Sequence, residues 1–189
     1  CVAVLAELDP EAGISPLLTV IPVGDELEHV RNYLTIQQMR YKNKFRFTID
    51  AEPETLDCAT IKLIVQPIVE NAIYHGMEFM DGDGEIRIRA YRRGGDLYME
   101  VADNGLGMPQ EQAEALLTGA AKAPASSSAP SGRGSGIGLR NVAERIRLYF
   151  GDAYGLSIRS EPDEGTTVRI HLPARRCGEG ALPQKGGKT

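Results

Sequence analysis

Apolar side chains recur along the chain at helical or strand spacing, and these patterns predict three helices and five strands. The first helix has Leu27, Val30, Leu34 and Tyr41 at helical spacing, and Asp25 ahead of them can cap its beginning. Residues at this spacing lie along one side of a helix, so we expect that side to be buried against the rest of the domain.

The second helix is predicted over 59–76, after a strand over 45–49 in which apolar and polar residues alternate. Pro67 lacks a backbone N–H, so we expect it to kink or restart the helix, and Gly76 suits the helix end. The apolar stripe of this helix is formed by Ile61, Ile64, Ile68, Ala72 and Ile73.

Two hairpins and a third helix complete the pattern. Alternation over 86–90 and 97–101, on either side of a Gly-Gly pair, is typical of two strands joined by a tight turn. A helix over 139–150 and a second hairpin over 156–172 follow. Strands joined mainly by hairpins, with helices between them, predict an α/β fold: a two-layer sandwich with a mixed, mostly antiparallel sheet and helices on one face.

Two stretches contain too few apolar residues to pack, namely 119–136 and 174–189. An internal stretch of this kind is more often a functional lid than a linker, and we expect a mobile lid over about 109–135. The predicted organisation is therefore an N-terminal segment and helix over 1–43, one domain over 44–173, and a flexible tail.

The composition is that of a soluble globular protein, with 189 residues of which 42% are hydrophobic and 25% charged. A net charge of −5 argues against nucleic acid as a partner. The three cysteines lack the spacing of a zinc site, and no apolar run approaches the ~20 residues of a membrane span. The chain begins with Cys1 rather than Met, so we expect it to be a segment of a longer protein.

Three polar groupings interrupt the hydrophobic pattern, and the first is Glu70-Asn71 in the second predicted helix, with His75 after it. Asn71 and His75 are four residues apart and share a face, whereas Glu70 lies about 100° around the helix. A polar helix end that faces solvent is the ordinary explanation. A carboxylate and an amide beside a run of Ile and Val also suit Mg²⁺, which takes few protein ligands and keeps waters.

The second and third groupings are rich in glycine. Residues 103–109, DNGLGMP, are common turn chemistry, but Asp103 would also be a fixed acceptor, and Gly105 and Gly107 would let a flat ligand approach the backbone. Residues 132–139, GRGSGIGL, precede the third helix and are either a hinge or a phosphate site at its N-terminus. They match neither a Walker loop nor the dinucleotide fingerprint, so a phosphate site here would be of a third kind.

The order of these groupings resembles the Bergerat ATP-binding fold, which gyrase, ninety-kilodalton heat-shock chaperones, histidine kinases and mismatch-repair ATPases share, over about residues 55–173. Within this fold, the sequences of the motifs are similar to those of sensor histidine kinases. QPIVENAIYHG (66–76) resembles their N box, DNGLGM (103–108) their first glycine box and GSGIGLRN (134–141) their second. The helix over 25–42 is similar to the one ahead of the ATPase domain in the autolysin- and sugar-sensing subgroup.

The resemblance implies a protein-histidine kinase domain that binds ATP with Mg²⁺. Asn71 would ligate Mg²⁺, and Asp103 would accept a hydrogen bond from the adenine amino group. Glu70 would polarise the acceptor imidazole, and His75 would lie near the ATP phosphates. The remaining implied contacts to the nucleotide come from the glycine boxes and the closing strand, namely Gly105, Gly107, Met108, Gly134, Gly136, Gly138, Leu139 and Thr166.

None of the three histidines is a convincing phosphoacceptor: His29 lies among charges, His75 in the N box and His171 in the closing strand. We therefore expect transfer to a histidine in an upstream dimerisation region of a homodimeric parent, which would serve a cognate response regulator. The resemblance implies a cytoplasmic domain whose parent is a bacterial inner or plasma membrane protein. Two alternatives share the fold: an anti-sigma-type serine kinase, and a gyrase- or chaperone-type ATPase in which Glu70 would activate water.

Overall fold

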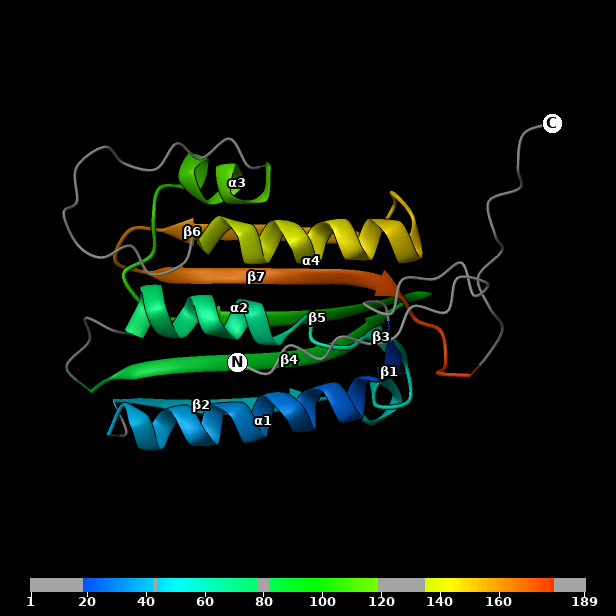
Figure 1. Cartoon of the computed structure of the whole chain (residues 1–189), viewed down its shortest axis with the longest axis horizontal. Coiled ribbons are helices and arrows are strands. Elements are labelled where there is room, and N and C mark those ends of the chain that lie inside the picture. Colours follow the sequence, from blue (N-terminus) through cyan, green and yellow to red (C-terminus); the bar gives the residue numbers. More distant parts are fainter. Residues whose placement is uncertain (1–18, 43, 78–81, 119–134, 179–189) are drawn as a thin grey trace, which may run out of the picture.

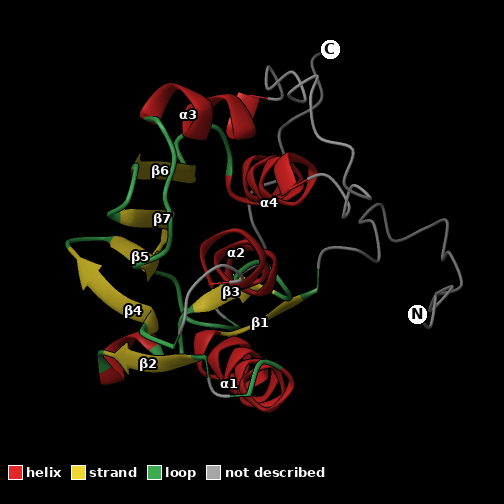
Figure 2. Cartoon of the chain, turned by 90° about the vertical axis from the view of Figure 1, so that its left-hand side faces the viewer, coloured by secondary structure: helices red, strands yellow, loops and turns green. Residues whose placement is uncertain are grey.

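The computed structural model describes residues 19–42, 44–77, 82–118 and 135–178, which form a sheet and a layer of helices packed on one of its faces. Figure 1 looks onto the helices with the strands behind them, and the end-on view in Figure 2 separates the two layers. The two-layer α/β sandwich predicted from the hydrophobic pattern is confirmed.

The main sheet has five strands in the order β2-β4-β5-β7-β6. β2 pairs parallel with β4 and the other neighbours are antiparallel, so the sheet is mixed and mostly antiparallel, as predicted. Val101 lies opposite Ile88 on one side and Val168 on the other, so inward apolar side chains form a row across the sheet. The sequence pattern missed the short strands β1 and β3, which pair with each other. The strands are β1 (Val20–Pro22), β2 (Phe45–Ala51), β3 (Ala59–Ile61), β4 (Gly84–Arg93), β5 (Asp96–Asp103), β6 (Gly155–Glu161) and β7 (Gly165–Pro173).

The helices cover the apolar face of the sheet, and the core lies between the two layers. Leu34, Ile68 and Ile146, from three different helices, are fully or almost fully buried in this core. The helical segments are α1 (Val23–Arg40), the 3₁₀ turn η1 (Pro53–Thr55), α2 (Gln66–Asn71), the π-helical turn η2 (Ala72–Met77), α3 (Gln110–Thr118) and α4 (Ser135–Phe150).

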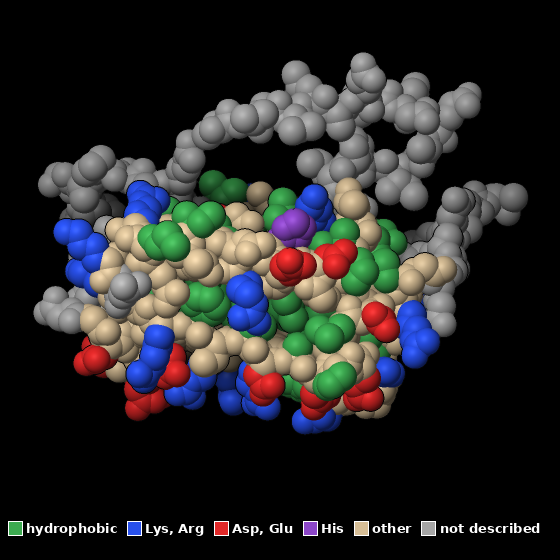
Figure 3. Space-filling model, turned by 90° about the horizontal axis from the view of Figure 1, so that it is seen from below, with side chains coloured by type: hydrophobic (Ala, Val, Ile, Leu, Met, Phe, Trp, Pro, Cys, Tyr) green, Lys and Arg blue, Asp and Glu red, His purple; other side chains and the backbone are tan. Residues whose placement is uncertain are grey.

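α1 lies at the edge of the helical layer, and Leu27, Val30 and Leu34 on its predicted apolar face are buried. The predicted cap is wrong, because the helix begins at Val23, ahead of Asp25, and no side chain caps it. Asp25 lies in the first turn, where its charge still favours the helix N-terminus. Seen from below, on the side of α1 and β2, acidic and basic side chains intermix around scattered hydrophobic groups (Figure 3).

The second helix begins later than predicted. Ile61 ends β3 and Ile64 lies in the following turn, so only the last part of the predicted stripe is helical. Pro67 occupies the first turn of α2, where a missing N–H leaves no bond unmade, so the helix starts there. All five residues of the stripe are buried nonetheless, because β3 and the turn face the same core. Gly76 lies in the π-helical turn that continues α2.

Residues 110–118, at the start of the predicted lid, form α3, which packs on α4 and β6. The other residues of that prediction, 119–134, lie outside the described residues, so a mobile lid stays a prediction. No helix within the described part of the chain is long and apolar enough to cross a membrane.

The described chain continues beyond the predicted end of the domain at residue 173. The backbone N–H of Ala59 donates to the carbonyl of Arg175 at 2.7 Å, and the N–H of Cys177 donates to the carbonyl of Asp57 at 2.9 Å. The first residues of the predicted tail are therefore held against the segment between η1 and β3.

Candidate functional site

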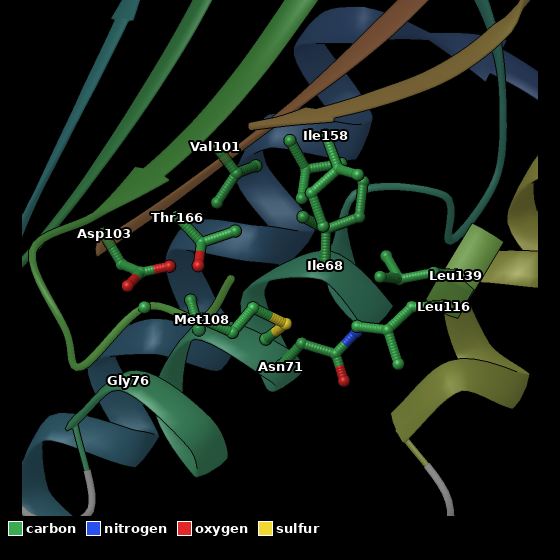
Figure 4. Close-up of a pocket in the computed structure, with 13 residues that line it drawn as sticks. Ile68, Asn71, Gly76, Val101, Asp103, Met108, Leu116, Leu139, Ile158 and Thr166 are labelled. Atoms are coloured by element: carbon green, nitrogen blue, oxygen red, sulfur yellow. The ribbon is translucent and has the colours of Figure 1, made fainter. Parts of the chain in front are cut away.

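A pocket opens between the helices and one end of the sheet, with a cavity of about 50 Å³. That is several times the roughly 10–15 Å³ needed to hold one water, so it has room for a larger group. In Figure 4, Asp103 and Thr166 lie together on one side of the pocket, with Asn71 across from them and Leu116 and Leu139 beyond it. The lining residues are Ile68, Asn71, Ala72, Gly76, Val101, Asp103, Gly107, Met108, Leu116, Leu139, Ile158, Thr166 and Val168.

Asp103 is the acidic group of this pocket. It is the last residue of β5 and lies directly opposite Thr166 of β7. Burial raises the pKa of its carboxyl to about 6, although backbone N–H groups of Gly105 and Thr166 donate to it and lower that pKa. The bond from Gly105 measures 3.0 Å. A poorly hydrated carboxylate that faces a pocket is suited to accept a hydrogen bond from a ligand.

Asn71 and Glu70, at the end of α2, lie in different surroundings, as their helical spacing predicts. Asn71 lines the pocket, and its Nδ2 is buried without a hydrogen-bond partner among the described residues. Such an unpaired amide is unusual in a native structure and remains available to a bound group. Glu70 does not line the pocket, and its carboxylate accepts a hydrogen bond of 3.0 Å from Nε2 of Gln66. The side chain of His75 lies outside the described part of the structure.

The loop over 104–109 is held closely against the rest of the protein at its two glycines. Gly107 has φ +58°, and a Cβ there would lie 2.9 Å from the carbonyl oxygen of Gly165. Gly105 faces the backbone of Gly76 so closely that a Cβ would overlap it. From the sequence, both glycines are expected to let a flat ligand approach the backbone. The space beside both is instead taken up by protein backbone, although Gly107 also lines the pocket.

Ser160 of β6 connects this loop to the closing hairpin. The backbone N–H of Met108 donates to its Oγ at 2.9 Å, and this Oγ lies 2.8 Å from the hydroxyl of Thr166. The Ser160 N–H in turn donates to the side-chain oxygen of Gln110 at 3.0 Å. Ser160 was not predicted from the sequence, because a polar residue in an alternating strand has the same pattern whether it faces solvent or makes a specific hydrogen bond.

The predicted phosphate residues lie at the beginning of α4. Gly136 and Gly138 belong to the first turn of this helix rather than to a loop ahead of it, and Gly134 lies outside the described residues. Leu139 lines the pocket. A Cβ on Gly138 would lie 3.7 Å from Cβ of Pro67, which shows how closely α4 approaches α2 here.

Apart from Met108 and Leu139, the apolar walls were not among the predicted site residues. Ile68, Val101 and Ile158 belong to ordinary core stripes of a helix and two strands, and the pocket is the open end of that core. Alternation identifies which side chains point inward. Alternation does not identify the inward side chains that line the pocket, where the sheet and the helical layer separate.

Comparison with known proteins gives a family match and several relatives. Residues 57–176 match the family described as histidine kinase-, DNA gyrase B- and HSP90-like ATPase. The chain is 38% identical over 156 residues to sensor histidine kinase YesM of Bacillus subtilis, covering 82% of this chain and 24% of that protein. It is 32% identical over 160 residues to sensor protein LytS of Bacillus anthracis, covering 85% and 26%. The chain therefore spans about a quarter of the length of these relatives.

Solved structures support the same fold. The catalytic domain of histidine kinase ThkA superposes with a TM-score of 0.59 at 16% identity, covering 84% of this chain and 98% of that domain. The histidine kinase domain of a blue-light activated kinase from Erythrobacter litoralis gives 0.55 at 18% identity, covering 86% and 66%. Because the family match extends over well more than half of the chain, this protein belongs to the histidine kinase-, DNA gyrase B- and HSP90-like ATPases, whose name implies ATP binding.

Proposed function

We propose that this chain is the ATP-binding catalytic domain of a two-component sensor histidine kinase, which transfers the γ-phosphate of ATP to a histidine outside this chain. One observation carries the proposal. Asp103, Thr166 and Asn71 reach a single apolar pocket from three separate elements, in a chain that is 38% identical to a sensor histidine kinase over 156 residues.

The adenine base binds in the pocket. Its flat ring packs against the apolar walls, and its 6-amino group donates to the Asp103 carboxylate beside the Thr166 hydroxyl. Guanine carries an acceptor oxygen where adenine carries this amino group, so an ionised Asp103 favours adenine. Gly107 and Met108, which line the pocket, flank the base, and the N–H of Gly105 holds the Asp103 carboxylate.

The triphosphate extends from the pocket toward the start of α4. Free N–H groups at a helix N-terminus attract anions, and Gly134, Gly136 and Gly138 leave this backbone uncovered by side chains. Leu139, the next residue after these glycines, lines the pocket. The lid predicted from the sequence over about 109–135 would close over the bound nucleotide.

Asn71 is the residue that would hold Mg²⁺. Within the described residues, no group of three or more His, Cys, Asp or Glu gathers as a metal site. The side-chain oxygen of Asn71, which lines the pocket, is the type of ligand that Mg²⁺ takes, and the unpartnered Nδ2 of the same amide would be free to donate to a bound group. Bound there, Mg²⁺ neutralises negative charge on the phosphates.

Glu70 acts on the acceptor imidazole. One imidazole nitrogen bonds to the γ-phosphorus while the bond to the bridging oxygen breaks and ADP leaves, and Glu70 accepts the proton of the other ring N–H. The hydrogen bond from Gln66 holds the Glu70 carboxylate for this task. His75 belongs to the same N box, and the resemblance to sensor histidine kinases implies that it would lie near the phosphates.

The other histidines of the described chain do not suit the acceptor role. His171 pairs with Asp96 at 3.1 Å and stacks on Tyr98 with ring centroids 4.8 Å apart, and His29 is an exposed residue of α1. The acceptor therefore belongs to an upstream dimerisation region of a homodimeric parent, which passes the phosphate to a cognate response regulator. The names and greater length of the relatives support a longer parent kinase. We propose that the domain lies in the cytoplasm and that the parent is anchored in the bacterial inner or plasma membrane.

Labelling with γ-³²P ATP tests the proposal. The chain alone should gain almost no acid-labile phosphate, whereas adding the upstream segment of its parent should place label on a histidine there. Acid-stable label on serine would favour a serine kinase instead, and phosphate release without labelling would favour an ATPase. Strong labelling of the isolated chain that His29→Ala abolishes would also overturn the proposal.

A further inference from the structure

The carboxylate of Glu26 is completely buried, although it belongs to a helix at the edge of the domain. Its oxygens accept hydrogen bonds from the backbone N–H groups of Leu63 at 2.8 Å, Ile64 at 2.9 Å and Val65 at 2.9 Å. These residues directly precede α2, and Val65, at the cap position, supplies no side-chain hydrogen bond. Glu26 therefore caps the N-box helix from 37 to 39 residues earlier in the chain.

Arg145 of α4 holds the same turn from the other side. Its guanidinium donates to the carbonyl oxygens of Lys62 at 2.6 Å and Leu63 at 3.1 Å. Burial lowers the pKa of Arg145, and the nearby charge of Glu26 opposes that effect. Leu63 has φ +60°, a left-handed conformation that persists in a non-glycine residue only when its surroundings impose it. The turn is thus the point at which α1, α2 and α4 are joined by charged groups.

α1 is also coupled electrostatically to the N-box helix two turns further along. Tyr33 follows Glu26 by seven residues and so lies on the same face of α1. The charge of Glu70 raises the Tyr33 pKa, after the larger effect of burial. α1 and α2 run in the same direction, one beside the other (Figures 1 and 2). α1 therefore packs on α2, with hydrogen bonds to the turn ahead of α2 and an electrostatic effect between Tyr33 and Glu70.

We infer that Glu26 is a positioning residue for phosphotransfer: by capping the N-box helix from α1, it makes the placement of Glu70 and Asn71 depend on the position of α1. This inference rests on the proposed function. Asp103 and Thr166, which would receive the adenine amino group, come from the sheet, so recognition of that group depends less on this cap than the placement of Glu70 does. A displacement of α1 by the upstream region therefore slows transfer while the nucleotide stays bound.

The test compares Glu26→Gln with Glu28→Gln, a matched change at an exposed position of the same helix. In Glu26→Gln, hydrogen exchange should speed up at the amides of residues 63–71 and stay unchanged in β5 and β7. The rate of transfer to the upstream segment at saturating Mg·ATP should fall at least about tenfold, while the Kd for ADP without Mg²⁺, a complex that does not use the Asn71 ligand, changes by less than about threefold. Glu28→Gln should leave exchange, transfer and Kd as in the parent chain.

A purely structural role predicts a different result, because partial unfolding lowers transfer and nucleotide binding together, in proportion to the folded fraction. That result, or unchanged exchange at 63–71, would overturn the inference. If Glu26→Gln does not fold, Glu26→Asp replaces it, and the same separation of transfer from Kd is expected with a smaller loss. If the parent chain transfers no phosphate, the proposed function fails, and the exchange of residues 66–71 still decides whether Glu26 holds the helix.

Discussion

Gly76 and Gly105 bring the N box and the first glycine box into direct backbone contact. A Cβ on Gly105 would overlap the Cα of Gly76, and a Cβ on Gly76 would lie 2.9 Å from Oδ1 of Asp103. Any side chain at either position would force the two segments apart. The carboxylate of Asp103 consequently lies at the end of the N-box helix, and one pocket contains groups from both motifs.

Gly105→Ala should therefore destabilise the chain and weaken ATP binding. The new methyl group meets backbone atoms, which cannot rotate away, so we expect a loss of about 1–3 kcal/mol in the free energy of unfolding. Gly95→Ala is the control, because a Cβ there meets nothing within 4 Å. Urea denaturation and nucleotide titration of the two variants measure the difference. Equal stability of both would show that the loop over 104–109 moves freely.

The sequence predicted the layers and the motifs because each depends on local patterns. Alternation in β4 and β5 and the Gly-Gly turn between them were enough to predict that hairpin. The start of α2 could not be predicted from periodicity, because Ile61 and Ile64 are as apolar as a helical stripe and differ only in their tertiary neighbours. The parallel pairing of β2 with β4 is also set by contacts that no local pattern records.

The stability of the chain without nucleotide should depend on pH through Asp103. Its pKa rises from 3.8 to about 6 on folding, so the folded state binds more protons than the unfolded state between these two values. The free energy of unfolding therefore falls as pH rises from about 4 to about 6, by up to about 3 kcal/mol, and this loss is complete above pH 6.

Asp103→Asn isolates this effect, because the amide stays neutral at every pH. We expect the variant to be more stable than the parent at pH 7, by up to about 3 kcal/mol, and equally stable near pH 4. It should bind ATP more weakly, because the charged acceptor for the adenine amino group is lost. Denaturation curves from pH 4 to 8 provide the measurement. A difference that does not vary with pH would contradict the assignment of this proton to Asp103.

Ser160→Ala should loosen the loop that carries Met108. The hydroxyl is bonded to the Met108 N–H and to the Thr166 hydroxyl, and its removal leaves those groups without this partner. We expect a loss of about 1–2 kcal/mol in stability and a several-fold weaker affinity for ATP. Ser157→Ala, at an exposed position of the same strand, is the matched control and should behave like the parent. Nucleotide titration that fails to separate the two variants would argue against a role for Ser160.

The site was only partly predictable from the sequence, because folding alone brings some of its residues together. Asp103, Asn71, Met108 and Thr166 could be identified because short motifs contain them, and the structure places all four around one pocket. Ser160 and the apolar walls of the pocket contribute through contacts that form only in the folded chain. Their residue types are the same as those of an ordinary strand or core.

Asn71→Asp should abolish phosphotransfer while leaving the fold intact. The carboxylate adds negative charge beside the triphosphate and replaces the neutral amide oxygen proposed for Mg²⁺. Asn32→Asp makes the same chemical change at an exposed position of α1 and should transfer phosphate at the parental rate. Transfer to the upstream segment is the measurement. Full activity of Asn71→Asp would remove Asn71 from the proposed site.

Glu70→Gln should separate binding from chemistry. Glu70 does not line the pocket, so the Kd for Mg·ATP should change by less than about threefold, whereas loss of the proton acceptor should slow transfer by about 10²–10⁴-fold. Glu111→Gln, an exposed change on α3, is the control and should alter neither quantity. Single-turnover labelling at saturating ATP measures the transfer rate without the binding step. A transfer rate equal to that of the parent would mean that another group receives the imidazole proton, whereas an equal loss of binding and transfer would place Glu70 against the nucleotide rather than the acceptor histidine.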